Sequence, residues 1–92
     1  MLKLVGNDVY RASEKIGWIE GNHVFGHDGR KLGYFDSLRI YDINADKVAY
    51  VEGDTLYDAA GNHKAHLEDI SEDIEGVLGT TGKCAIYVLL GT

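Results

Sequence analysis

The chain repeats itself at intervals of sixteen residues. The pairs Val24-Phe25, Ile40-Tyr41 and Leu56-Tyr57 lie sixteen residues apart, and Val9-Tyr10 precedes the first of them by fifteen. Each pair is followed by a second segment of the same kind, at residues 16–19, 32–35, 48–51 and 64–67. A fixed short period restricts a chain to architectures that arrange copies of one small unit. The repetition therefore decides the architecture of residues 5–67.

Each repeat has the pattern of a β-hairpin. Asp28-Gly29 is the strongest turn signal, and residues 44–46 and 60–62 occupy the corresponding position in later repeats. A second set of turns, at residues 6–7, 21–22, 37–38 and 53–54, joins one hairpin to the next. Twelve glycines and no proline suit a meander of this kind, because turns need positive φ and strands need every N–H. We predict a single, mainly β domain over residues 1–92, with about eight short antiparallel strands in four hairpins around a pseudo-four-fold axis.

Side chains alternate between the two faces of a strand, which separates the residues of each hairpin into two sets. If Asp28-Gly29 is a two-residue turn, Phe25 opposes Leu32 and Val24 opposes Gly33. The position occupied in turn by Gly17, Gly33, Ala49 and Ala65 predicts a close approach of backbones near the axis. The opposite face collects the larger rings, and we interpret it as a possible interaction face, made of Trp18, Phe25, Tyr34, Tyr41, Tyr50 and Tyr57.

The repeated pattern G-x-x-[VIL]-[YF], a glycine-bearing turn, and [ILV]-[GA]-[WY]-[ILVF] resembles the 4-fold β-flower domain family over residues 5–67. The resemblance implies four hairpin petals around a pseudo-four-fold axis, and it implies no chemistry. The fourth repeat departs from the pattern, because Lys64 and His66 replace an aliphatic and an aromatic residue. Similar phrases occur in PRC-barrel and WG-repeat proteins, which remain alternatives.

Residues 68–92 do not repeat. Leu67, Ile70, Ile74, Val77 and Leu78 have the spacing of an amphipathic helix, which Gly79 is expected to end. The following run CAIYVLLG, at residues 84–91, is interpreted as a final strand that is apolar on both faces. We expect this strand to lie beside residues 2–5, to cap the flower, or to pack against a second subunit.

Composition limits the partners. The net charge is −6, and residues 68–92 carry five acids against one base. The sequence has no cluster of Lys and Arg of the kind that binds nucleic acids, and no apolar run is long enough to span a membrane. Residues 1–8 lack the apolar core of a signal peptide. Cys84 is the only cysteine, which fits a reducing cytoplasm and a small buried side chain.

Few residues form a pattern that suggests chemistry. Glu20, Asp36, Glu52 and Glu68 share one repeat register and could ring a cation, although surface acids are the favoured interpretation. His23 and His27, and His63 and His66, are spaced for a metal only if the fold brings them together with a third ligand. No catalytic motif contains any of the three serines, Ser13, Ser37 and Ser71, or the GTTGK loop at residues 79–83. We therefore expect no enzymatic activity and no cofactor.

The sequence favours a non-enzymatic structural or protein-interaction module. Its partner is expected to be a second copy, in a dimer or larger assembly, or another protein. A small-ligand or cation-binding protein that uses the axial region or the Glu20 register is the alternative.

Overall fold

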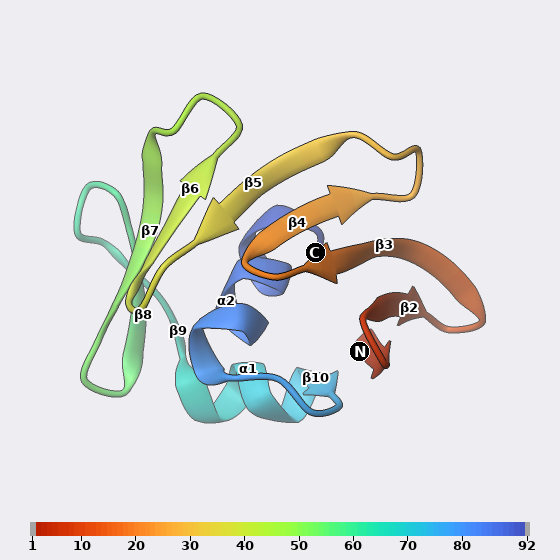
Figure 1. The fold of residues 1–92 in the computed structure, drawn as a ribbon. Coiled ribbons are helices and arrows are strands. Elements are labelled where there is room, and N and C mark those ends of the chain that lie inside the picture. The colour runs from red at the N-terminus through yellow and green to blue at the C-terminus, as the bar shows by residue number, and fades with distance from the viewer. Residues whose placement is uncertain (1, 92) are drawn as a thin grey trace.

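The computed structural model describes residues 2–91, which form one sheet of ten strands and two helices (Figure 1). Strands β1 to β9 follow one another in the sheet in chain order and pair antiparallel, while β10 pairs parallel with β1. The elements are β1 (Leu2–Val5), β2 (Asp8–Arg11), β3 (Glu14–Glu20), β4 (His23–Gly26), β5 (Lys31–Phe35), β6 (Arg39–Asp42), β7 (Lys47–Glu52), β8 (Thr55–Asp58), β9 (His63–His66), α1 (Leu67–Asp73), β10 (Ile74–Glu75) and α2 (Thr80–Leu89).

The predicted meander of hairpins is confirmed. Strands β2 to β9 are the eight strands expected from the repeats, and the fold is mainly β with a helical C-terminal part. Three of the turns that join the hairpins begin with a glycine at positive φ, namely Gly6, Gly21 and Gly53. A Cβ at any of them would meet no atom within 4 Å, so conformation and not space selects glycine there. The pseudo-four-fold axis stays a prediction.

The register inside each hairpin differs from the predicted one by a single residue. Val24 pairs with Gly33 as expected, but Phe25 pairs with Lys31 instead of Leu32. The turn is longer than two residues: the N–H of Gly29 donates to the carbonyl of Gly26, and the N–H of Gly26 donates to the carbonyl of Arg30. Such a loop leaves one residue of the second strand unopposed, which is a β-bulge.

The same register shift occurs in all four hairpins, between Val9 and Tyr10, Val24 and Phe25, Ile40 and Tyr41, and Leu56 and Tyr57. The unopposed residues on the second strands are Ile16, Leu32, Val48 and Lys64. A bulge reverses the alternation of side chains beyond it. Residues three apart across each bulge therefore lie on the same face of the sheet, where simple alternation would separate them.

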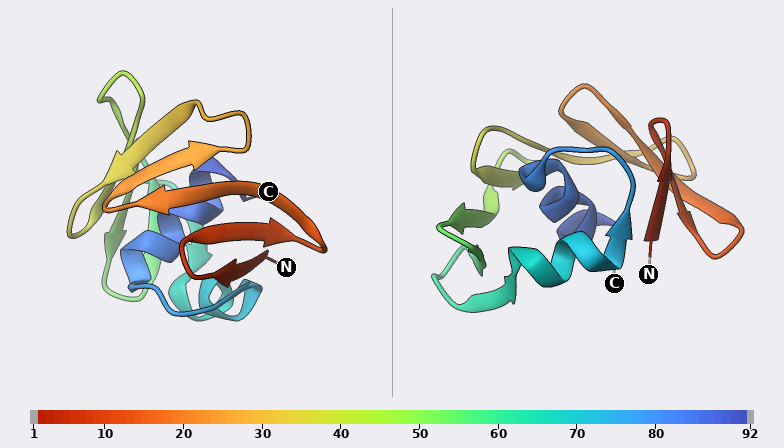
Figure 2. Two further views of the ribbon diagram at one scale, coloured as in Figure 1. Left: turned by 45° about the vertical axis from the view of Figure 1, so that its right-hand side comes forward. Right: turned by 90° about the horizontal axis from the view of Figure 1, so that it is seen from below.

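The sheet curves around α2, which lies on its concave side (Figures 1 and 2). Helix α2 contacts β4, β5, β6 and α1. Helix α1 begins directly after β9 at one edge of the sheet and ends directly before β10 at the other, so it connects the two edges. The core lies between the concave face and the helices, and its buried apolar residues are Leu2, Leu4, Val9, Ile19, Val24, Ile40, Ala49, Val51, Leu56, Ile70, Ile74, Cys84, Ala85 and Ile86.

The predicted final strand is wrong, because most of the CAIYVLLG run belongs to α2. Cys84, Ala85 and Ile86 are all fully buried against the concave face. A strongly curved sheet leaves a space that a rod of side chains can fill, and a strand would cover it only in part. The hydroxyl of Thr81 donates to the carbonyl of Ser37 over 2.7 Å, which fixes the start of α2 to the turn between β5 and β6.

The predicted helix over residues 67–78 is too long. Helix α1 ends at Asp73, and Ile74 and Glu75 pair with Leu2 and Lys3 of β1. Strand β1 would otherwise present unpaired backbone groups at the sheet edge, and this parallel pairing satisfies part of them. The prediction that Val77 lies on the apolar face of this helix is wrong, because Val77 is 99% exposed in the loop before α2.

The predicted small-residue position is confirmed as a place of close approach. A Cβ on Gly33 would lie 2.1 Å from the carbonyl oxygen of Tyr41 and 3.0 Å from the Leu89 side chain. A Cβ on Gly17 would meet the carbonyl oxygen of Phe25 and the Leu90 side chain at 2.2 and 3.0 Å. The glycines at this position therefore admit both the backbone of the neighbouring strand and the side chains of the C-terminal segment.

Candidate functional site

The six rings predicted to share a face lie on the side of the sheet opposite α2, in three stacked pairs. Trp18 and Phe25 have centroids 5.4 Å apart and planes 4° apart. The other pairs are Tyr34–Tyr41, at 4.9 Å and 14°, and Tyr50–Tyr57, at 5.3 Å and 19°. Each pair consists of residues directly opposed on adjacent strands. Offset-stacked rings add about 0.5–1.5 kcal/mol beyond burial, so the pairs also hold one hairpin to the next.

A lysine accompanies each pair. The Nζ atoms of Lys15, Lys31 and Lys47 lie 5.1, 5.3 and 4.9 Å from the ring centroids of Trp18, Tyr34 and Tyr50. These distances are within the range of cation–π attraction. Each lysine lies three residues before its ring, and the bulge between them places both on the same face. Without the bulge, lysine and ring would point to opposite sides of the sheet.

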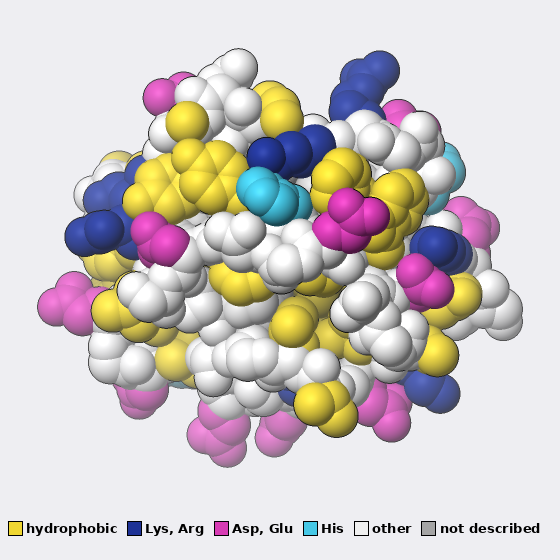
Figure 3. Space-filling model, in the orientation of Figure 1, with side chains coloured by type: hydrophobic (Ala, Val, Ile, Leu, Met, Phe, Trp, Pro, Cys, Tyr) yellow, Lys and Arg dark blue, Asp and Glu magenta, His cyan; other side chains and the backbone are white. Residues whose placement is uncertain are grey.

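The clusters follow one another across the strands. Lys31 pairs across the strands with Phe25, and Lys47 pairs with Tyr41, so each of these two lysines lies between two aromatic pairs. Lys15, at the start of the series, pairs with Tyr10. We call this surface the belt, made of Lys15, Trp18, Phe25, Lys31, Tyr34, Tyr41, Lys47, Tyr50 and Tyr57. All six rings are half-buried, while Lys15 and Lys47 are exposed. In the space-filling view, hydrophobic side chains lie beside Lys and Arg over the strands (Figure 3).

A shallow hollow of about 230 Å³ opens at one end of the belt. It is lined by Leu38, Arg39, Lys47, Tyr50, Val51 and Glu52. Two cationic side chains and a tyrosine ring thus meet one carboxylate at the turn between β5 and β6. Positive charge next to an aromatic ring favours the binding of an acidic side chain.

The four carboxylates of the Glu20 register are not brought together. Among residues 2–91 no group of three or more His, Cys, Asp or Glu side chains could hold a metal ion. Asp36 instead closes a turn: its carboxylate accepts hydrogen bonds from the N–H groups of Leu38 and Arg39 and from the hydroxyl of Tyr41. Although desolvation opposes them, these bonds lower the pKa of Asp36. Its role is to fix the β5–β6 turn.

Among the remaining candidates only His63 and His66 lie together, with ring centroids 4.9 Å apart, and no third ligand joins them among the described residues. His27 is exposed in the turn before β5, and Nδ1 of His23 is buried without a hydrogen-bond partner among the described residues. Burial raises the pKa of the Cys84 thiol to about 11, which removes it as a nucleophile. Ser13, Ser37 and Ser71 are exposed. Thr81 and Gly82 of the GTTGK segment belong to the first turn of α2.

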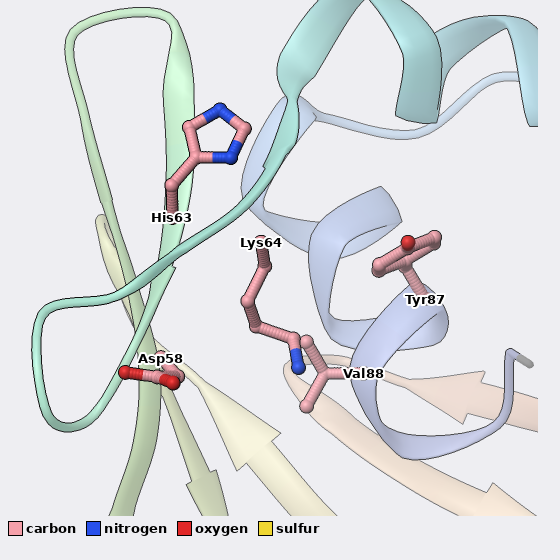
Figure 4. Close-up of a pocket in the computed structure, with 5 residues that line it drawn as sticks. All are labelled: Asp58, His63, Lys64, Tyr87 and Val88. Carbon is pink, nitrogen blue, oxygen red and sulfur yellow. The ribbon is translucent and has the colours of Figure 1, made fainter.

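A second hollow, of about 430 Å³, lies between the end of the sheet and α2 (Figure 4). Asp58, His63 and Lys64 line it from the sheet, and Tyr87 and Val88 line it from the helix. Lys64 is the unopposed residue of the fourth hairpin, in the position where the other hairpins have isoleucine, leucine and valine. The hollow thus opens at the repeat that departs from the pattern.

Sequence reasoning identified the rings of the belt and missed its lysines. The signal was present, since Lys15, Lys31 and Lys47 are themselves sixteen residues apart. It was hidden because simple alternation assigns residues three apart to opposite faces, and the bulges were not foreseen.

No family model matches the chain, and comparisons with curated proteins and with solved structures also found no match. The resemblance to the β-flower family therefore stays a prediction. No helix among residues 2–91 is long and apolar enough to cross a membrane.

Proposed function

We propose that the protein is a non-enzymatic interaction module and that its belt binds an acidic protein surface. The observation that supports this proposal most strongly is the threefold recurrence of a lysine over a stacked aromatic pair on the face opposite α2. Aromatic rings with adjacent cations favour partners that offer carboxylates and apolar contacts together. The concave face offers no comparable surface, because α2 fills it.

The chain carries an acidic surface of its own. Helix α1 exposes Glu68, Asp69, Glu72 and Asp73, which we call the acidic face of α1. No basic residue lies in its last turn, and neither of the two ion pairs found within residues 2–91 involves it. In the space-filling view, acidic side chains gather along the lower edge, where α1 lies (Figure 3).

We therefore propose a second copy of the chain as the partner, with its acidic face of α1 on the belt. This contact joins two different surfaces, so it is head-to-tail and builds rings or open chains instead of a symmetric dimer. Belt against belt would oppose lysines to lysines and is disfavoured. Cys84, Ala85 and Ile86 of the CAIYVLLG run are buried within the chain, so charge complementarity supports the association more strongly than the apolar surface of this run does.

Exposed ion pairs contribute only about 0.2–1 kcal/mol each, so the association should be weak and sensitive to salt. Light scattering coupled to gel filtration should report masses above that of one chain at about 0.02 M NaCl, falling to the monomer mass by about 0.5 M. A wild-type protein that stays monomeric at low salt and high concentration would contradict the proposal.

Two charge-reversal variants make the test specific. Lys31→Glu/Lys47→Glu reverses two charges of the belt and leaves the acidic face of α1 intact. Glu68→Lys/Glu72→Lys reverses two charges of the acidic face of α1 and leaves the belt intact. Each variant alone should be monomeric at low salt, because its belt and its α1 then carry charges of the same sign. An equimolar mixture should form complexes that contain both variants, because the belt of each variant is opposite in charge to α1 of the other.

A matched control reverses two exposed acids outside α1, in Glu14→Lys/Asp46→Lys. This control should still associate. If it is also monomeric, net charge and not the acidic face of α1 controls association, and the head-to-tail arrangement is wrong. If the mixed variants form no complex, the belt and α1 do not meet.

A further inference from the structure

The fourth hairpin carries a pair of histidines in the place where the other hairpins carry a lysine and a ring. His63 corresponds to Lys47, and His66 corresponds to Tyr50. The imidazole centroids of His63 and His66 are 4.9 Å apart, with their planes at 72°. The ring of Tyr57 also lies near His63, with its centroid 6.4 Å away and its plane nearly perpendicular. The fourth hairpin therefore carries two adjacent imidazoles just beyond the last ring pair of the belt.

The backbone places these two rings together. The register shift between Leu56 and Tyr57 leaves Lys64 unopposed, and this bulge puts His63 and His66 on the same face of β9. Strand β9 is held on one side by β8, and it lies at the end of the sheet. The location of both imidazoles on one face thus follows from a backbone feature shared with three other hairpins.

The immediate surroundings leave the imidazole nitrogens accessible. His63 and His66 are both exposed, and no hydrogen bond within residues 2–91 involves either ring. The nearest cation in sequence, Lys64, extends toward Val88 of α2 and away from the ring of His63 (Figure 4). In the other hairpins the first member of the pair is itself a cation, which would repel a metal ion.

Neutral imidazole nitrogen is the preferred side-chain ligand of late first-row divalent metals, with bonds of about 2.0–2.1 Å to zinc. Two imidazoles on one short rigid segment form a chelate, and exposed side chains rotate readily enough to aim both nitrogens at one ion. We propose that His63 and His66 form a two-imidazole site for Cu²⁺ or Zn²⁺, with water completing the coordination.

The site is independent of the proposed self-association, because neither histidine belongs to the belt surface or to the acidic face of α1. It also differs from the carboxylate ring considered from the sequence, whose four acids do not converge. A site with nitrogen ligands should bind Cu²⁺ more tightly than it binds either Ni²⁺ or Zn²⁺. Cu²⁺ is therefore the most sensitive probe.

The experiment is a titration of the full chain with CuCl₂ near neutral pH, followed by calorimetry and by electron paramagnetic resonance. We expect one Cu²⁺ per chain with nitrogen ligation from two imidazoles. His63→Ala and His66→Ala should each weaken binding by about tenfold or more, since each loses half of the chelate.

Two further variants keep the test interpretable. His66→Tyr restores the residue type of the other hairpins, so it should fold normally and still lose tight binding. His27→Ala removes an exposed histidine from a different turn and should bind Cu²⁺ as the wild type does. Equal affinity of the wild type and the His63→Ala/His66→Ala double variant, or ligation by a single imidazole, would overturn the proposal.

Discussion

Adding a single methyl group to Gly33 should destabilise the protein more than most surface changes do. The Cβ of alanine at this position would lie 2.1 Å from the carbonyl oxygen of Tyr41, 3.2 Å from the Cα of Asp42 and 3.0 Å from the Leu89 side chain. The first of these neighbours is backbone and cannot rotate away. Reaching even 3.0 Å from it requires β5 and β6 to separate locally by about 0.9 Å.

The cost of Gly33→Ala has two sources. Weakening the ladder at the Gly33–Asp42 pair costs about 1 kcal/mol, the net value of one hydrogen bond. Overpacking against Leu89 adds about 1–3 kcal/mol. The total of about 2–4 kcal/mol compares with about 5–14 kcal/mol for the whole stability of a chain of this length. The variant should therefore fold, with a melting temperature lower by roughly 8–30 °C. Gly33→Leu should be worse, because its side chain must also displace Leu89.

Thermal melts followed by circular dichroism would measure this effect. Gly79→Ser is the matched control, because a Cβ there meets nothing within 4 Å and serine is a good residue at the N-cap of α2. It should melt at or slightly above the wild-type temperature. A Gly33→Ala protein that melts within about 2 °C of the wild type would show that β6 and α2 do not approach β5 as described.

Three other predictions concern single features of the fold. Ala45 has φ of 66°, so Ala45→Gly should relieve backbone strain and raise the free energy of unfolding by up to about 1 kcal/mol, measured by urea denaturation. Cys84 is buried with its pKa raised to about 11, so a thiol reagent at pH 8 should label it only in denaturant; rapid labelling of the native protein would place α2 elsewhere. The pKa values of Asp28 and Asp58 are lowered, first by hydrogen bonds from the backbone N–H of Arg30 and Asn62. These carboxylates therefore stabilise the fold above the unfolded pKa near 3.8, and this contribution is lost as the pH falls through their lower folded values. Asp58→Asn should accordingly show a smaller loss of melting temperature between pH 5 and pH 3 than the wild type does, and an identical loss would contradict this role.

The sequence contained enough information to predict the hairpins and the aromatic face. The sixteen-residue period located every strand from β2 to β9, because turn residues and apolar pairs recur together. The stacking of Trp18 on Phe25 follows once the turn at Gly21-Asn22 makes these residues direct neighbours. The bulges could not be read from alternation alone, since one additional loop residue exchanges the faces beyond it.

The C-terminal part shows why local patterns were insufficient. Isoleucine, tyrosine and valine in a short apolar run are typical of a strand, and periodicity cannot distinguish such a run from a buried helix. The helix is favoured because it fills the concave face of the sheet, and that face is formed by residues outside this run. Likewise, Ile74 has helical spacing from Ile70, but the free edge of β1 draws it into a parallel pair. Both outcomes depend on contacts with residues far away in the sequence.

The position of α2 in the chain order has a consequence for folding kinetics. Each hairpin pairs residues that are close together in the sequence, so the meander can form early and quickly. Its apolar concave face, however, is completed only by side chains such as Ile86, which come after every strand in the chain. During synthesis on the ribosome, the hairpins emerge well before the segment that fills them. Until that segment arrives, the nascent sheet exposes its future core, and chaperones that recognise apolar surfaces have their longest opportunity to bind it.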